Sequence, residues 1–274
     1  MERPAPYDPG SPASGRRLWN ECGGQQQITA LEYLLSVRDS RGAGYLPLLD
    51  PDRLPLDELE ARAQACAEVG ADAILVGTSL MLSTSRNAAL FERLKQSVDV
   101  PVISFPGDAS QVVPTADALL FLVMISGRNP ELLIGQHVRA APLLKEYGLE
   151  VIPTGYMLIE SGTLTSAEYM SSTRPMPRGK KDIAMTHALA AEFLGMKLIY
   201  MDTGSGAGDS VSGQLISAVV DYISLPVIVG GGIRDPETAR AKVDAGASFV
   251  VTGTAVETDP SRLRELSDAV HCRG

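Results

Sequence analysis

The chain has 274 residues, of which 33 are acidic and 24 basic, so its formal net charge is −9 at pH 7. This charge argues against nonspecific nucleic-acid binding, and a hydrophobic share of 45% fits a folded globular protein. The cysteines at 22, 66 and 272 have neither metal-ligand spacing nor a disulfide framework. No apolar run has membrane-spanning length and no signal peptide is visible, so we expect a cytoplasmic protein.

Residues 1–24 are rich in Pro, Gly, Ser and Arg and have no apolar period. They predict a flexible tail before one domain over residues 25–274. A short helix is expected over residues 28–38, and short apolar runs then alternate with amphipathic segments. This alternation predicts an α/β fold, a parallel (β/α)₈ TIM barrel. The eight expected strands cover 45–49, 73–76, 100–104, 118–123, 150–154, 197–202, 226–229 and 248–251.

Two connections depart from a regular barrel. The segment from Ser104 to Ala116 is too short and too interrupted for a crossover helix, so either the third barrel helix is missing or the expected strands are miscounted there. Residues 155–181 form a long insertion after the fifth strand, on the face where active-site loops lie. His137 and His187 fall on expected helices, which favours structural roles for both.

Two aspartates and one cysteine indicate where particular helices lie. Asp235 and Asp259 each precede a proline, which predicts two helices that begin with a capping Asp. Cys66 lies on an apolar helical face and is expected in the core.

Three glycine-bearing turns follow the last three apolar runs. They lie at residues 203–206, 230–232 and 253–254. Glycines at strand ends let backbone N–H groups approach an anion closely, and a helix that begins there adds its positive dipole end. Together the three turns predict a phosphate site on a TIM barrel and therefore a phosphorylated substrate.

Several side chains near strand ends are candidates for chemistry. Asp50 and Asp52 either bind Mg²⁺ or cap the following helix, and Ser79 either adds a ligand or is a turn residue. Asp202 ends the sixth strand and is either a general base or a helix cap. In the long fifth loop, Arg178, Lys180 and Lys181 either grip a diphosphate or form a solvated basic loop.

As an ordered set, these motifs resemble the geranylgeranylglyceryl phosphate synthase family of TIM-barrel prenyltransferases. The resemblance covers about residues 43–257, and that family also lacks a regular third barrel helix. The motifs that carry it are Leu49-Asp50-Pro51-Asp52, Gly77-Thr78-Ser79, Gly155-Tyr156, Pro175-Met176-Pro177-Arg178, the run from Ala188 to Lys197, the run from Val229 to Arg234, and Val251-Thr252-Gly253-Thr254.

The resemblance implies Mg²⁺ as cofactor, with Asp50 and Ser79 as its ligands. It implies that an allylic prenyl diphosphate is joined to a hydroxyl of a glycerol phosphate, with an acid at position 202 removing the proton and Tyr200 beside it. It also implies a homodimer without a membrane span and a product that associates with the membrane. The acceptor would be held by Tyr200, Met201, Asp202, Thr203, Gly204, Ser205, Gly206, Gly231, Gly232, Gly253 and Thr254.

Departures from the family pattern suggest a changed substrate. The family's Tyr-Leu-Glu becomes Tyr200-Met201-Asp202, Arg53 stands where longer-chain enzymes often carry Lys, and the loop over 161–173 differs. The chain looks most like the bacterial branch that attaches a farnesyl-type chain to the 2-hydroxyl of 3-phosphoglycerate in moenomycin-type antibiotic biosynthesis. Arg178 or Lys180 would then contact the diphosphate or the acceptor carboxylate.

Other readings stay open. Within the class, the alternative is an enzyme that joins a longer prenyl chain to sn-glycerol 1-phosphate. Outside it, a phosphosugar isomerase or aldolase would share the glycine turns, although Lys197 begins a strand at the wrong end for a Schiff base. A non-catalytic protein that binds a phosphate ligand is the third alternative.

Overall fold

The computed structural model describes residues 21–22, 26–78 and 85–271. The expected tail lies outside these residues except for β1 (Glu21–Cys22), which pairs with β2 (Gln26–Gln27) in a short antiparallel ladder. Within the described part of the chain, no helix is both long and apolar enough to cross a lipid bilayer.

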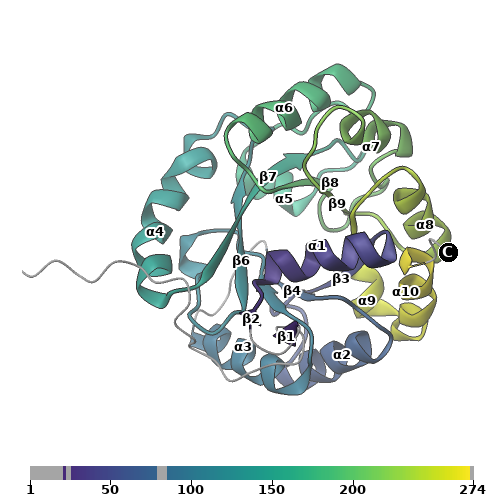
Figure 1. Ribbon diagram of the computed structural model, residues 1–274. Helices are drawn as coiled ribbons and strands as arrows, with labels where there is room; N and C mark the ends of the chain where they lie inside the picture. The colour runs from purple at the N-terminus through teal and green to yellow at the C-terminus, as the bar shows by residue number, and fades with distance from the viewer. Residues whose placement is uncertain (1–20, 23–25, 79–84, 272–274) are drawn as a thin grey trace, which may run out of the picture.

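Eight parallel strands close into a barrel, which confirms the expected TIM fold (Figure 1). Neighbouring strands follow the order of the chain, and the last strand pairs with the first to complete the circle. The strands are β3 (Gly44–Leu49), β4 (Ile74–Val76), β5 (Val102–Ser104), β6 (Ala118–Val123), β7 (Glu150–Leu158), β8 (Leu198–Asp202), β9 (Val227–Gly230) and β10 (Phe249–Thr252).

Helices surround the barrel, with one gap where the sequence predicts it. Between β5 and β6 the chain forms only a single 3₁₀ turn, η2 (Ala109–Gln111), so the regular third helix is missing as expected. The described helices are α1 (Ala30–Arg41), α2 (Leu56–Glu68), α3 (Ser85–Ser97), α4 (Gln136–Tyr147), α5 (Ser166–Ser171), α6 (Lys181–Phe193), α7 (Gly213–Val220), α8 (Pro236–Asp244), α9 (Thr254–Thr258) and α10 (Leu263–His271).

Alternation along each strand creates two hydrophobic layers. In β8, Tyr200 points into the barrel and joins the inner cluster, whereas Ile199 and Met201 join the outer cluster beneath the helices. Because successive side chains of a strand point to opposite faces, a fully buried strand carries apolar residues on both. Cys66 of α2 is buried in the outer layer, and burial raises the pKa of its thiol to about 12, as expected for a core residue.

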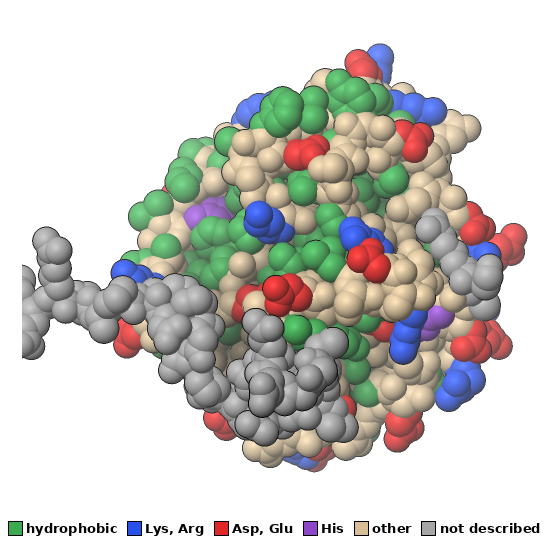
Figure 2. All heavy atoms as spheres, in the orientation of Figure 1, with side chains coloured by type: hydrophobic (Ala, Val, Ile, Leu, Met, Phe, Trp, Pro, Cys, Tyr) green, Lys and Arg blue, Asp and Glu red, His purple; other side chains and the backbone are tan. Residues whose placement is uncertain are grey.

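Helix α1 lies across the N-terminal end of the barrel (Figure 1). Its first residues are held by the carboxylate of Glu150, which accepts hydrogen bonds from the backbone N–H groups of Ala30 at 2.6 Å and Leu31 at 3.0 Å. Ala30 and Leu34 pack into the inner cluster, so the helix seals this end. Figure 2 shows the same face, where acidic and basic side chains are interspersed with hydrophobic ones.

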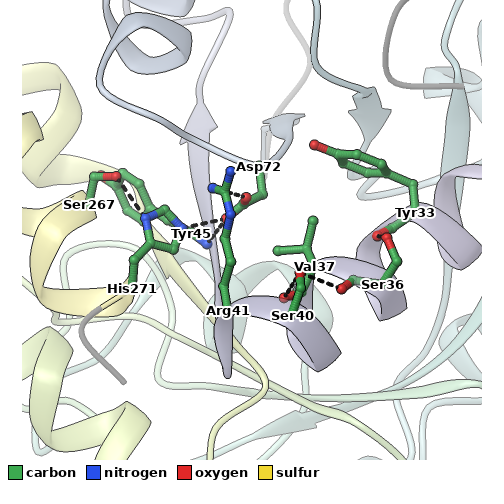
Figure 3. A network of polar contacts seen from close by, with 9 residues as sticks. All are labelled: Tyr33, Ser36, Val37, Ser40, Arg41, Tyr45, Asp72, Ser267 and His271. Atoms are coloured by element: carbon green, nitrogen blue, oxygen red, sulfur yellow. Dashed lines mark hydrogen bonds and ion pairs between the residues drawn. The ribbon is translucent and has the colours of Figure 1, made fainter. Parts of the chain in front are cut away.

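A buried carboxylate ties three elements together at the sealed end (Figure 3). Asp72, only 1% exposed, accepts hydrogen bonds from the Tyr45 backbone N–H at 2.8 Å and from Arg41 of α1 at 3.0 Å. Nε2 of His271 in α10 lies 2.7 Å from the same carboxylate, and Nδ1 of His271 lies 3.3 Å from the Ser267 hydroxyl. The first helix, the first barrel strand and the last helix therefore meet at one residue.

Two local expectations are corrected by the structure. Strand β7 continues through Gly155 to Leu158, so the start of the expected insertion is strand. A Cβ on Gly155 would lie 3.0 Å from Ala191 Cβ of α6, so this glycine marks a close approach of helix and strand rather than a turn. Asp235 caps α8 as expected, but Asp259 makes no side-chain cap and is followed by a 3₁₀ turn, η4 (Pro260–Arg262).

Candidate active site

The three glycine turns meet around one small cavity at the C-terminal ends of β8, β9 and β10. Its volume is about 60 Å³, and it contains Arg234 as well as the turn residues. Most of the expected acceptor residues are therefore brought together. The lining residues are Leu48, Tyr200, Asp202, Gly204, Ser205, Gly206, Gly231, Gly232, Ile233, Arg234, Val251, Thr252, Gly253 and Thr254.

Two residues of the expected acceptor set do not line this glycine-lined cavity. The side chain of Met201 is fully buried in the outer layer, because it alternates with the inward-pointing Tyr200 and Asp202. Thr203 is buried, and its hydroxyl has no hydrogen-bond partner among the described residues. Gly231 has a φ of +80°, and a Cβ there would press on the Thr203 hydroxyl and lie 2.6 Å from Asp202 Oδ1. The close approach thus requires glycine.

Asp202 is a buried carboxylate held by neutral donors. The Tyr156 hydroxyl donates to Asp202 Oδ2 at 2.6 Å, and the Gly204 backbone N–H donates to Oδ1 at 2.8 Å. Removal from water raises the pKa of Asp202, while these hydrogen bonds act in the opposite direction. A carboxylate with a raised pKa in a cleft is suited to accept a proton from a bound hydroxyl.

Three aromatic rings pack together on one side of this carboxylate. Tyr156 stacks on Tyr200 with ring centroids 5.5 Å apart, and Phe105 lies 5.3 Å from Tyr200 and 6.3 Å from Tyr156. Burial and the neighbouring Asp202 both raise the pKa values of the two tyrosines, which keeps them protonated. The rings make an apolar, water-poor setting on one side of Asp202.

A second, larger cavity adjoins the first and is mostly apolar. It has a volume of about 340 Å³ and extends from Asp202 over the outer face of β6 to α4. We call it the apolar groove. The two cavities share Leu48, Asp202, Ser205, Gly253 and Thr254. Its deeper walls are formed by Val112, Leu119, Phe121, Leu132, His137 and Ala140.

The groove exists because of the missing helix. The short turn η2 replaces a helix that would otherwise cover the outward-pointing Leu119 and Phe121 of β6. On the other side, the π-helical turn η3 (Glu131–Gly135) leads into α4, which supplies His137. His137 Nε2 donates to the Leu122 carbonyl at 2.9 Å, and its ring meets Phe121 edge-on at 4.5 Å. The other ring nitrogen, Nδ1, is buried without a partner among the described residues.

Oxygen-bearing side chains gather at the mouth of the groove. Asp50 and Glu257 line it, and Thr78 donates from its hydroxyl to Asp52 Oδ2 at 2.9 Å. Arg53 connects the group, with 2.9 Å to Glu257, 3.2 Å to Asp50 and a 2.9 Å hydrogen bond to the Ser205 hydroxyl. Burial raises the pKa of Glu257, although Arg53 opposes this shift.

The oxygen-bearing side chains at the mouth are of the kind that Mg²⁺ prefers as ligands. No group of three or more His, Cys, Asp or Glu residues in the described ranges forms a ready metal cage. Mg²⁺, however, is commonly held by one or two carboxylates together with substrate phosphates and waters. Asp50 offers such a carboxylate beside the groove. The other expected ligand, Ser79, lies outside the described residues.

The basic residues of the fifth loop are not brought to these cavities. Arg178 is exposed and pairs at 2.6 Å with Asp209, and Lys180 is an exposed residue immediately before α6. Neither lines the glycine-lined cavity, the groove or the pocket at the mouth. The expected contact of Arg178 and Lys180 with substrate therefore finds no support in their position. The cations that do line these spaces are Arg53 and Arg234.

Sequence reasoning missed several residues that the fold brings to the site. Tyr156 was named only within the Gly155-Tyr156 motif and received no role, because the expected strand ended at residue 154, four residues before the end of β7. Glu257 follows the last glycine turn on α9, and Arg234 follows Gly231-Gly232, so a scan one helical turn beyond each glycine motif would have found both. His187 bonds the Ile183 carbonyl at 2.7 Å within α6, which fits its expected structural role.

Comparison with known proteins agrees with this geometry. The family model described as the PcrB family matches residues 36–270. The geranylgeranylglyceryl phosphate synthase of Chitinophaga pinensis is 48% identical over 224 residues, which is 82% of this chain and 88% of that protein. The corresponding enzyme of Thermofilum pendens is 38% identical over 85% of this chain and 90% of its own length.

A solved structure extends the likeness to three dimensions. The (S)-3-O-geranylgeranylglyceryl phosphate synthase of Thermoplasma acidophilum, in complex with its substrate sn-glycerol-1-phosphate, superposes with a TM-score of 0.85 at 31% identity. The match covers 89% of this chain and 99% of that one. The chain therefore belongs to the PcrB family and is an enzyme of the prenyltransferase class.

Proposed function

We propose that this enzyme joins the geranylgeranyl group of a prenyl diphosphate to sn-glycerol 1-phosphate through an ether bond. The observation that carries the proposal is the meeting of two unlike cavities at one buried carboxylate. The glycine-lined cavity suits a small phosphate ester, and the apolar groove suits a hydrocarbon chain. Asp202 lies in the wall that both share.

Charge at the groove mouth favours a divalent cation as cofactor. The carboxylates of Asp50, Asp52 and Glu257 face this region, and Arg53 is already paired with two of them. A diphosphate would meet more negative than positive charge there. Mg²⁺ held by Asp50, and by Ser79 as the family resemblance implies, would neutralise the leaving diphosphate.

The chain's own residues would then arrange a single displacement. The glycine turns and Arg234 hold the acceptor phosphate, and the groove aligns the allylic carbon with the acceptor hydroxyl. The new carbon–oxygen bond forms as the bond from carbon to diphosphate breaks, and the diphosphate leaves with that electron pair. The hydroxyl proton passes to Asp202, while the aromatic rings exclude water from the carbon.

The comparisons favour the acceptor that the sequence analysis gave as the alternative. The reported relatives are named geranylgeranylglyceryl phosphate synthases, and none of those reported is named for the antibiotic branch. In the glycine-lined cavity, Arg234 is the cationic residue among the described lining, and it already donates to the Gly208 carbonyl at 3.3 Å. A second anionic group, such as the carboxylate of 3-phosphoglycerate, would lack a charged partner there.

A two-by-three assay tests the proposal. Purified protein with Mg²⁺ is given geranylgeranyl or farnesyl diphosphate and one of three acceptors: sn-glycerol 1-phosphate, its enantiomer or 3-phosphoglycerate. We expect the highest kcat/KM with geranylgeranyl diphosphate and sn-glycerol 1-phosphate, and loss of turnover when EDTA removes the metal. Product from 3-phosphoglycerate but not from glycerol 1-phosphate would reverse the acceptor assignment. The homodimer stays a prediction, which sedimentation velocity at assay concentration would check.

A further inference from the structure

We propose that Tyr156 is a positioning residue for the general base, holding Asp202 in one orientation through the hydrogen bond from its hydroxyl. This inference rests on the proposed function, because it concerns how that reaction's proton is accepted. Tyr156 was named above only within the Gly155-Tyr156 motif, without a role in the site.

The contact is short and enclosed. The Tyr156 hydroxyl lies 2.6 Å from Asp202 Oδ2, across the β7–β8 pair, in which Tyr156 is in register with Tyr200. Tyr156 is 6% exposed and Asp202 8%, so water has little access to compete with the hydrogen bond. The opposite oxygen, Oδ1, is held at 2.8 Å by the Gly204 N–H. Two donors, one on each oxygen, thus fix the plane of the carboxylate.

The phenol is itself fixed by packing. Its ring stacks against Tyr200 with a 30° angle between the planes, and Phe105 packs beside both. A phenol held in this way offers its hydroxyl to Asp202 from one direction, which limits the rotamers open to the carboxylate.

Tyr156 also stabilises the ionised form. Burial disfavours the charge on Asp202, and hydrogen bonds from Tyr156 and the backbone favour it, so removing the phenol raises the pKa of Asp202 further. Other titratable or charged groups lie farther along the walls of the two cavities. They are Tyr200 on β8, Asp50 after β3, Asp108 before η2, His137 on α4, Arg234 after β9 and Glu257 on α9.

The test is the pH dependence of kcat in Tyr156→Phe, measured with saturating Mg²⁺ and both substrates. Because the base must be ionised, activity rises with pH through the pKa of Asp202, and we expect this acidic limb to move upward by about one pH unit or more. Tyr222→Phe, a partly exposed tyrosine just after α7, is the matched control and should leave the profile unchanged.

A second variant should move the acidic limb of the pH profile in the opposite direction. Replacing Tyr156 with a ring-fluorinated tyrosine keeps the hydroxyl but makes it a stronger donor, so the acidic limb should move to lower pH. A uniform loss of kcat in Tyr156→Phe, with the acidic limb unmoved in both variants, would overturn the proposal. Thermal melting of each variant identifies a failure to fold, which the fluorinated variant is designed to avoid.

A separate readout distinguishes this inference from the proposed function. Carbon-13 NMR of labelled aspartate carboxyls titrates Asp202 directly in wild type and in Tyr156→Phe, without any substrate. If wild-type protein fails to make the ether, the proposed function fails. A higher pKa of Asp202 in Tyr156→Phe than in wild type would still support the contact. If the ether forms and the Asp202 titration is the same in both proteins, this inference alone fails.

Discussion

Two buried aspartates stand at opposite ends of the barrel, and their surroundings differ in kind. Asp72, at the end sealed by α1, is met by Arg41 and His271 as well as a backbone N–H. Asp202, at the end with the cavities, is met by a phenol and backbone N–H groups, with no ion pair to it in the described residues. Figure 3 shows the first arrangement.

This difference is the one expected between a structural carboxylate and one that accepts a proton, the role proposed for Asp202. A buried carboxylate beside a guanidinium has its charge compensated locally and links the elements that supply its partners. A buried carboxylate with neutral donors alone keeps a raised pKa and a capacity to take a proton. Asp72 and Asp202 are both buried aspartates, so what distinguishes their expected roles is the charge of the groups that contact them.

The largest effect should follow from Asp202→Asn. We expect kcat to fall by about 10²–10⁴-fold, because the amide cannot accept the hydroxyl proton. The same change should raise the melting temperature at neutral pH. Burial places the folded-state pKa of Asp202 above its unfolded value, so wild type loses stability as pH rises through that folded-state pKa, and the variant does not.

Melting curves over a pH series, read beside the kinetics, check this prediction. The gain in melting temperature should vanish in acid, where the wild-type carboxyl is protonated in both states. An unchanged kcat would remove Asp202 from the mechanism, and a gain independent of pH would point to a cause other than its charge.

The opposite balance is expected for Asp72→Ala. Loss of the carboxylate leaves the Tyr45 N–H buried without its acceptor and removes the link to α1 and α10. We expect the free energy of unfolding to fall by about 2–4 kcal/mol, with kcat at 25 °C within about twofold of wild type. Denaturant titration measures this loss of stability. The control is Asp244→Ala, which removes an exposed ion pair with Arg240. A tenfold loss of kcat in folded protein would show that the two ends are coupled.

A smaller effect, confined to one substrate, should follow from Ala140→Phe. Ala140 lies on α4 in the wall of the apolar groove, near the outward face of β6. A ring there should shorten the groove and lower kcat/KM for geranylgeranyl diphosphate about tenfold, with less effect on farnesyl diphosphate. Ala141→Phe, on the exposed side of the same helix, is the matched control. Equal losses for both donors would mean that the chain does not extend to this wall.

The smallest effect is expected for Arg178→Ala. Its side chain is 53% exposed and paired with Asp209 rather than directed at a cavity. We expect KM for the prenyl diphosphate to change by less than about twofold, whereas Arg53→Ala at the groove mouth should change it more. Initial-rate kinetics of the two variants decide whether the fifth loop or the groove mouth supplies the positively charged side chain that contacts the diphosphate.

The barrel was predictable because each strand is a short apolar run and each connection but one is long enough for a helix. Even the missing helix was visible, as a connection interrupted by prolines and glycine after Ser104. Boundaries were less accurate where one residue has two meanings. In the sequence Gly155 suggests the end of a strand, yet it lies inside β7. There the absence of a side chain lets Ala191 of α6 pack closely against the strand.

The site was predictable in its backbone and less so in its side-chain partners. Glycine turns that directly follow parallel strands all lie at the C-terminal end of the barrel. The positions of the glycine-lined cavity and of Asp202 could therefore be predicted from the order of the motifs. Which distant side chain faces Asp202 depends on strand register, since Tyr156 is 46 residues away. The direction of Arg178 depends on Asp209, a partner that its own sequence neighbourhood does not reveal.

The single 3₁₀ turn between β5 and β6 has an evolutionary consequence. The apolar groove therefore opens onto Leu119 and Phe121 on the outer face of β6 and reaches α4 at Ala140. Ala140 does not line the glycine-lined cavity, so a substitution at this wall changes the groove without touching the glycine turns. Descendants of such a chain can accommodate a different apolar ligand through single substitutions in that wall, while the glycine-lined cavity is inherited unchanged.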